Sequence, residues 1–235
     1  MKNAFTIAEV LITLGIIGVV AAMTLPTIID NSRNKQLESA LKKSYSTIAQ
    51  ALDMYYAEEG VKLTPKNCGH LQLKPILMKY INTVRDCGTD GRVHNSSKLC
   101  IVHNAYLTEE EKADVYKAYK SLDGNSDVEM GLFDDGQFVI NDTSLVLIEN
   151  NNNKNLFISV DVNGFNRRPN RLGIDLFMFQ ISDEGALLPM GIEGTYYTHT
   201  FGKLLCDNTL RVYMNGAACT YRALTEKDYF KNLPR

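Results

Sequence analysis

The pattern opens with an apolar run from Phe5 to Leu25 that holds one charged residue, Glu9, near its start. A helix rises about 1.5 Å per residue, so the run is about 30 Å long, which matches the hydrocarbon thickness of a bilayer. The pattern therefore predicts a membrane-spanning helix. A carboxylate at the centre of such a helix costs roughly 2.5–3.5 kcal/mol on insertion scales, which suggests that Glu9 has a partner.

The helical pattern continues beyond the span, from Thr27 to Glu59, and Gly60 is a natural stop. One helix over Phe5–Glu59 would be about 80 Å long. Its second half is amphipathic, and its apolar stripe needs a globular body to cover it. The stripe recurs at spacings of three, four and seven and consists of Ile28, Ile29, Leu37, Leu41, Tyr45, Ile48, Leu52, Tyr55 and Tyr56.

Beyond Gly60 the pattern predicts two short helices and then a sheet. The helices are expected over Leu71–Asn82 and over residues 108–121, where Thr108 and Glu111 form a capping box. Short strand-like runs separated by Gly, Asn and Asp clusters favour an antiparallel meander. The expected fold is therefore α+β, with a long N-terminal helix packed on a small antiparallel sheet. The strands are expected over Gln137–Asn141, Ser144–Glu149, Leu156–Val162, Leu176–Ser182 and Leu187–Met190.

Composition narrows the function classes. The chain has 235 residues, 45% hydrophobic and 22% charged, which is typical of a globular protein, and the part beyond the long helix has the size of one domain. The net charge of −2 gives no bulk basic surface for nucleic acid. The sequence holds no G-x-S-x-G, Walker, H-E-x-x-H or dinucleotide motif, so we expect no enzyme.

All five cysteines follow the apolar run: Cys68, Cys87, Cys100, Cys206 and Cys219. This distribution favours an oxidising compartment for the C-terminal body, although the basic residues after the span argue mildly for the reverse topology. We expect disulfides between Cys87 and Cys100 and between Cys206 and Cys219, each worth about 3 kcal/mol at this loop size, with Cys68 free. A Cys68–Cys87 pair is the main alternative, because sequence alone does not fix connectivity.

A zinc site is a second use for the same cysteines. Cys68 and Cys100 are each followed closely by a histidine, His70 and His103, and Cys87 would add a third thiolate. These spacings match no strong zinc signature, so disulfides are the favoured interpretation.

The leader and the start of the span resemble the type IV prepilins and the type II secretion pseudopilins. A short basic leader and a small residue, Ala4, precede Phe-Thr-x-x-Glu at Phe5–Glu9 and an apolar stretch that ends at Pro26. The resemblance implies cleavage between Ala4 and Phe5 by a prepilin peptidase, followed by N-methylation of Phe5. The family usually has Gly where this chain has Ala4. Further positions that match the family pattern are Val10, Leu11, Ile12, Gly15, Ile16, Ile17, Gly18, Ala21 and Ala22.

The resemblance also assigns assembly roles. It implies that Glu9 pairs with the N-terminal amine of an adjacent subunit, whereas taken alone Glu9 would reach to the nearby membrane interface. Gly18 and Ala22 are four apart, a spacing that lets helices approach closely. Pro26 removes one helical hydrogen bond, and in filaments of this family the stretch from such a glycine to such a proline can unwind.

A second stretch, Asp161 to Asp175, resembles a loop of many prepilin-like proteins, D-x-N-G followed by P-N and G-x-D. Its hard oxygen donors, Asp161, Asn163, Asn166 and Asp175, suit Ca²⁺, and some pseudopilins bind calcium near the sheet. An Asx-rich turn whose side chains bond their own backbone is the favoured interpretation.

Together these features predict a leader (1–4), a transmembrane and filament-core segment (5–26), an amphipathic continuation (27–60) and an extracytoplasmic body (61–235). The resemblance implies a structural subunit of a type IV pilus or type II secretion pseudopilus, held single-pass in a bacterial inner membrane. Its partners would be other pilin or pseudopilin subunits, the prepilin peptidase and the inner-membrane assembly platform. The alternative is a minor, tip-located binding module for adhesion, DNA uptake or recognition of a secretion substrate.

Overall fold

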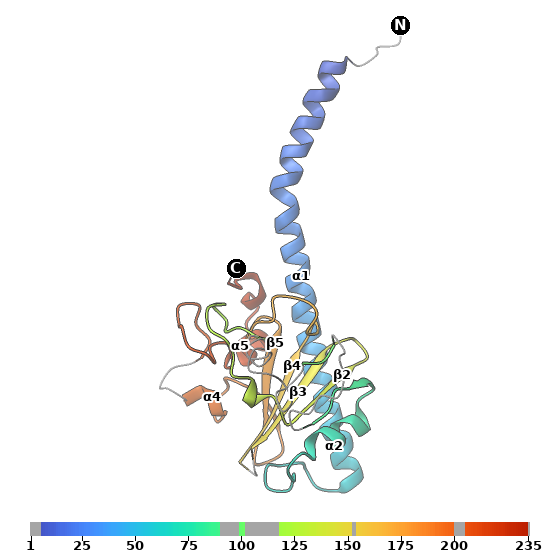
Figure 1. Ribbon diagram of the computed structural model, residues 1–235, viewed down its shortest axis with the longest axis vertical. Helices are drawn as coiled ribbons and strands as arrows, with labels where there is room; N and C mark the ends of the chain where they lie inside the picture. Colours follow the sequence, from blue (N-terminus) through green and yellow to red (C-terminus); the bar gives the residue numbers. More distant parts are fainter. Residues whose placement is uncertain (1–5, 90–98, 102–117, 152–153, 200–204, 235) are drawn as a thin grey trace, which may run out of the picture. The chain divides into compact units, whose positions relative to one another are not determined.

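The computed structural model describes residues 6–89, 99–101, 118–151, 154–199 and 205–234. Its longest element is helix α1, Ile7–Glu59, which confirms the long N-terminal helix expected from the sequence. The chain divides into two compact units, Met1–Gln36 and Leu37–Arg235. The first unit holds the apolar part of α1, and the second holds the rest of α1 and the body (Figure 1).

The body is built on one antiparallel sheet in which every strand pairs with its neighbours in sequence, in the order β1-β2-β3-β4-β5-β6. This meander follows from short apolar runs separated by tight turns. The sequence placed β2 to β6 within one or two residues and missed β1. The strands are β1 Thr83–Asp86, β2 Gly136–Ile140, β3 Leu145–Asn151, β4 Asn155–Asp161, β5 Leu176–Ile181 and β6 Leu187–Pro189.

Both edge strands of the sheet are irregular. In β1 the register shifts between Thr83 and Arg85, which leaves Val84 as a bulge that is 63% exposed. At the opposite edge, β6 is three residues long and ends in Pro189, which has no backbone N–H to donate.

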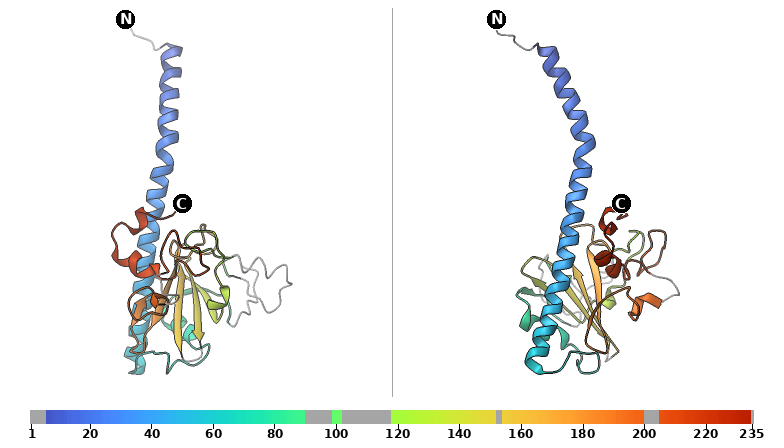
Figure 2. Two further views of the ribbon diagram at one scale, coloured as in Figure 1. Left: turned by 90° about the vertical axis from the view of Figure 1, so that its left-hand side faces the viewer. Right: turned by 180° about the vertical axis from the view of Figure 1, so that it is seen from behind.

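Residues 37–59 of α1 cover one face of the sheet, as the views from the front and from behind show (Figures 1 and 2). The Tyr45 ring stacks on Phe179 of β5 with ring centroids 5.7 Å apart. The Lys43 ammonium pairs with Asp142 in the β2–β3 turn at 2.8 Å. The buried positions recur every three or four residues, which is the period of a core-facing helix. They are Leu37, Leu41, Ser44, Ile48, Ala51 and Leu52.

The packing stripe starts later than the sequence pattern indicated. Ile28 and Ile29 were expected in it, yet both are 61% exposed, and the first buried side chain of α1 is Leu37. The pattern of spacing carries no information about where the covering body begins, so the prediction extended the stripe about ten residues too far.

Irregular segments and short helices pack around the rest of the sheet. Tyr119 donates from its hydroxyl to Asp161 Oδ2 at 2.6 Å, and the Thr220 hydroxyl accepts from the Met178 backbone N–H at 3.0 Å. Tyr119 precedes β2 in the chain and Thr220 follows β6. Their hydrogen bonds therefore hold segments from before and after these strands against β4 and β5. The remaining elements are α2 Leu73–Tyr80, η1 Met130–Leu132, α4 Tyr196–His199, α5 Cys219–Thr225 and η3 Tyr229–Lys231.

One expected helix is wrong at its end. Most of residues 108–121 lies outside the described residues, but residues 118–121 are not helical. Lys120 forms isolated bridges with Asp127 and Arg171 instead. The Tyr119 hydroxyl bond to the buried Asp161 outweighs local helix propensity there. The other expected helix is present as α2, and α4 and α5 were not predicted.

Candidate functional site

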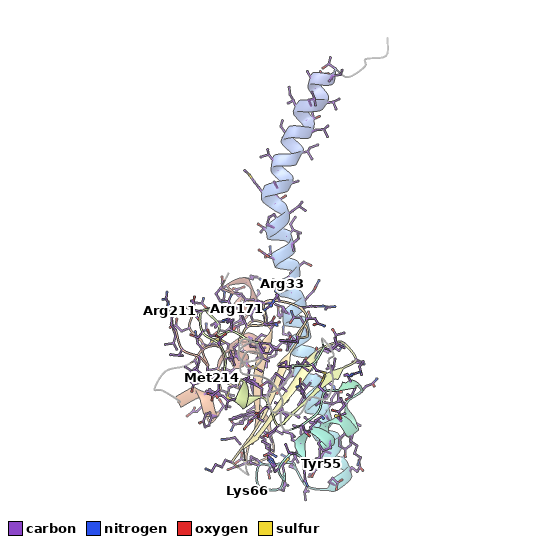
Figure 3. All side chains as sticks on the ribbon, viewed as in Figure 1. Arg33, Tyr55, Lys66, Arg171, Arg211 and Met214 are labelled. Atoms are coloured by element: carbon purple, nitrogen blue, oxygen red, sulfur yellow. A yellow bond between two sulfur atoms is a disulfide. The ribbon has the colours of Figure 1, made fainter. Side chains whose placement is uncertain are left out.

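The apolar segment of α1 is the most distinctive candidate site. Its side chains point outward on all sides of the helix (Figure 3), and its large apolar residues are between 45% and 81% exposed. Within the described residues, α1 is the one helix long and apolar enough to cross a membrane, judged by length and composition. The exposed residues are Ile7, Val10, Leu11, Ile12, Leu14, Ile16, Ile17, Val19, Val20, Met23 and Leu25.

Glu9 forms a capping box with Thr6 at the start of this helix. Glu9 Oε2 accepts from both the backbone N–H and the hydroxyl of Thr6, each at 2.8 Å, and the Thr6 hydroxyl accepts from the Glu9 backbone N–H at 3.2 Å. The T-x-x-E box satisfies two terminal donors. The sequence interpretation missed this role for Thr6, although the T-x-x-E spacing is the signal that reveals it.

Other polar groups of the segment are satisfied within the helix. The hydroxyls of Thr13 and Thr24 donate to the carbonyl oxygens of Val10 and Val20, each at 2.9 Å. Such internal bonds lower the cost of placing hydroxyls in lipid.

The small residues of this segment leave room for close approach. A Cβ built on Gly18 would meet no atom within 4 Å, so that surface is open to another helix. The helix continues through Pro26. Ala4 and Phe5, the expected processing residues, lie outside the described residues.

The cysteines are arranged as two disulfides and one thiol. Cys87 is bonded to Cys100 and Cys206 to Cys219, the pairing favoured from the sequence, and each closes a sequence separation of 13. Cys68 is a buried free thiol, and burial raises its pKa to about 11. The alternative Cys68–Cys87 bond is not formed.

The Cys87–Cys100 disulfide removes two of the expected ligands of the zinc site. Cys87 and Cys100 are bonded to each other, so neither offers a thiolate to a metal. His103 lies outside the described residues.

The loop between β4 and β5 brings Asp161 and Asp175 together in the interior, both fully buried. Asp161 Oδ1 accepts from the backbone N–H groups of Asn163 and Gly164, at 3.2 and 2.8 Å. Asp175 accepts from the N–H groups of Asn170 and Arg171, at 2.9 and 2.7 Å. Burial, with the charge of Asp175, raises the pKa of Asp161 well above its usual range.

These bonds make the loop an Asx-type turn closed by its own carboxylates. Asn163 donates to the carbonyl oxygens of Arg167 and Arg168, while Asn166 is exposed. The Oδ1 atoms of Asn163 and Asn170 have no hydrogen-bond partner among the described residues. Calcium at Asp161, Asn163 and Asp175 stays a prediction.

A second carboxylate group was not singled out from the sequence. Asp134, Asp135 and Glu149 place one oxygen each within 4.8 Å of the others. Burial, with the charges of Asp135 and Asp134, raises the pKa of Glu149 to about 8. Its Oε2 is shielded from solvent and has no hydrogen-bond partner among the described residues. The pairing of β3 with the turn before β2 brings these residues together, which single-sequence spacing does not reveal.

Comparison with known proteins adds no relative to this picture. No protein-family model, curated protein or solved structure matches the chain. The functional argument therefore rests on the residues of this chain.

Proposed function

We propose that this chain is a structural filament subunit of the type IV pilin or type II secretion pseudopilin class. One observation carries the proposal: a 53-residue helix whose apolar first half is exposed on all sides and bears a single early carboxylate, Glu9. Exposed apolar surface of this extent requires lipid or the helices of other subunits. A single subunit would reside in the inner membrane and later pack helix to helix in the filament. This role is structural and needs no catalytic group.

Processing follows from the leader in this proposal. A prepilin peptidase would cut between Ala4 and Phe5 and methylate the new amine. The amine would then lie one helical turn from Glu9 of its own chain, and in the filament it would pair with Glu9 of a neighbouring subunit. Since an unpaired carboxylate is costly in a low dielectric, a matched amine would favour ordered assembly.

Mass spectrometry of the mature N-terminus tests processing. We expect a chain that begins at N-methylated Phe5. Ala4→Gly should be processed at least as well, because the family usually has glycine there, and Ala4→Arg should block cleavage. An intact Met1 in the wild-type chain, or cleavage after Ala22, would refute the proposal.

Assembly is tested separately with Glu9→Gln, which keeps an oxygen that accepts from Thr6 but removes the charge. We expect normal membrane insertion and a large loss of filament yield. Glu38→Gln is a matched control on the same helix, because Glu38 pairs with Lys42 at the surface of the body. Normal filament yield from Glu9→Gln would show that the charge has no assembly role.

A minor, tip-located binding module is the second candidate, and one feature of the body favours it. A half-open cavity of about 640 Å³ lies between the segment around the Cys206–Cys219 disulfide and the C-terminal segment. Its lining mixes charges of both signs, including Arg222, Lys227 and Asp228. The position of the protein in isolated filaments, labelled with gold-tagged antibody, separates the two: a tip label would favour the binding module and uniform labelling the structural subunit.

A further inference from the structure

The loop between β4 and β5 is rich in arginine. Its residues 162–174 include Arg167, Arg168 and Arg171 and no acidic residue. Arg167 and Arg168 are exposed, and the Asn163 side chain donates to both of their carbonyl oxygens, at 3.2 and 3.4 Å. Arg171 is half-buried, and its guanidinium donates to the Leu122 carbonyl oxygen. We call residues 162–174 the arginine loop, which presents two arginine side chains at the surface.

The arginine loop lies at the end of the body where α1 begins to pack on the sheet. A Cβ added to Gly164 would clash with the Thr143 carbonyl oxygen, so the loop packs directly on the β2–β3 turn. That turn is tied to α1 by the ion pair between Asp142 and Lys43. Lys43 follows Leu37, the first buried residue of α1, by less than two helical turns. The loop and the start of the packed part of α1 are therefore neighbours.

The opposite end of the body lies beyond the C-terminus of α1. There the β5–β6 turn packs on the chain just after that helix, because a Cβ added to Gly185 would lie against Lys62 and Leu63. Arg171 of the arginine loop and Lys66 accordingly lie at opposite ends of the body (Figure 3). Lys62 and Lys66 are exposed, so they provide a matched pair of charges for comparison.

Positive charge is in excess around the arginine loop. The C-terminal segment belongs to this end, since the Tyr229 hydroxyl donates to the Gly173 carbonyl oxygen at 2.6 Å. The acidic side chains of residues 37–43, of the β2–β3 turn and of residues 222–234 each have a basic partner. The arginine loop adds positive charge that these acids do not balance. The pairs are Glu38–Lys42 at 2.5 Å, Asp142–Lys43 at 2.8 Å, Glu226–Arg222 at 2.8 Å and Asp228–Lys231 at 2.6 Å.

Chain length keeps this end of the body close to the apolar segment of α1. Residues 26–37 join Leu25, where the apolar run ends, to Leu37, and α1 is helical throughout. This stretch extends about 18 Å along a helix. The headgroup region of one leaflet takes up about 5–8 Å of that length, which leaves about 10 Å, or one Debye length at physiological salt. Charges at this end of the body are therefore within range of the lipid headgroups of a bilayer that the segment spans.

We propose that the arginine loop binds anionic phospholipid headgroups of the bilayer that the apolar segment spans. The inference rests on the proposed function, in which a single subunit resides in the membrane before assembly. A guanidinium pairs with phosphate oxygens through two parallel hydrogen bonds, and an anionic surface strengthens the contact of each nearby basic side chain about fivefold. The contact would hold the body against the membrane until the subunit is extracted into the filament.

Fluorescence quenching in nanodiscs tests this contact with the full-length chain. A dye is attached to Asn166→Cys in the arginine loop, and a second sample carries the dye at Lys66→Cys. The added thiol reacts selectively, because Cys68 is buried and the other four cysteines form disulfides. The bilayers contain a phospholipid with a nitroxide quencher on its headgroup, in phosphatidylcholine alone or in a mixture with phosphatidylglycerol.

We expect the dye at residue 166 to be quenched about twofold more, or better, in the anionic bilayer. Raised salt should remove the difference, because it screens exposed charges. The dye at residue 66 should be quenched equally in both bilayers. Equal quenching at residue 166 in both bilayers, or a similar rise at residue 66, would overturn the inference.

Charge-removing variants identify the groups responsible. Arg167→Gln with Arg168→Gln should return the quenching at residue 166 to its level in the neutral bilayer. Lys62→Gln with Lys66→Gln removes the same charge at the opposite end and should leave that quenching unchanged. Melting temperatures of both double variants check folding. Unchanged quenching in the arginine variant, or an equal loss in the lysine variant, would refute the location.

The measurement needs insertion of the apolar segment but neither processing at Ala4 nor assembly. A chain that inserts and shows no contact with anionic lipid refutes this inference alone and leaves the filament proposal standing. A chain that contacts the lipid but is not cleaved after Ala4 in cells refutes the filament proposal and keeps the lipid contact. Failure to insert would refute both.

Discussion

The raised pKa of Glu149 predicts an unusual dependence of stability on pH. The folded state raises this pKa from 4.5 to about 8, so folded protein binds the proton more tightly than unfolded protein. The stabilisation is complete below about pH 4.5 and is lost as pH rises toward 8. Each pKa unit corresponds to about 1.36 kcal/mol. Because the side chain is only partly buried, solvent screening reduces the total to about 2 kcal/mol.

Glu149→Gln isolates this effect, because glutamine has the same shape and does not ionise. We expect the variant to match wild type near pH 5 and to exceed it at pH 8.5 by about 2 kcal/mol, or roughly 4–8 °C in melting temperature for a body of this size. Circular dichroism of full-length protein in neutral detergent measures both melting curves.

Glu184→Gln, at an exposed turn position, is the matched control and should leave the wild-type profile unchanged. Parallel pH profiles for wild type and Glu149→Gln would contradict the reasoning, since they would mean that the Glu149 carboxyl ionises as it does in an unfolded chain.

Three further predictions concern the rest of the body. Replacing both Cys206 and Cys219 with alanine should lower the free energy of unfolding by about 3 kcal/mol, because a loop of this size is no longer closed in the unfolded chain; an unchanged denaturation midpoint would argue against the bond. Tyr119→Phe should cost about 1–3 kcal/mol by removing the 2.6 Å hydrogen bond to the buried Asp161, and urea denaturation with no change in midpoint would show that another donor replaces it. Millimolar calcium should leave the melting temperature unchanged, because backbone N–H groups already occupy the carboxylates of Asp161 and Asp175, and a clear rise would instead support the calcium prediction.

The strands that the sequence predicts are those with local signals. Turn clusters such as Asp183–Gly185 separate β5 from β6, and apolar residues at alternating positions mark the strands. β1 has no such signal, because its four residues are a strand only through pairing with β2. The end of the expected 108–121 helix failed for a related reason, since Tyr119 is held by a residue far along the chain.

The candidate sites divide in the same way. The apolar span and Glu9 are readable from sequence because their meaning is local: one charge at a fixed place in an apolar run. The capping role of Thr6 is local as well, because the T-x-x-E spacing places its hydroxyl beside Glu9. The Glu149 cluster depends on the register of β2 against β3, which the spacing of residues along the chain does not encode.

The irregular edge strands of the sheet affect how readily the protein aggregates at high concentration. An open, regular edge strand is a template that recruits the strands of other molecules, and this is the usual first step toward insoluble aggregates. Here one edge is distorted by the Val84 bulge and the other is short and lacks the Pro189 N–H group. The sheet therefore resists edge-to-edge extension, so that copies at high local density do not fuse into a continuous sheet.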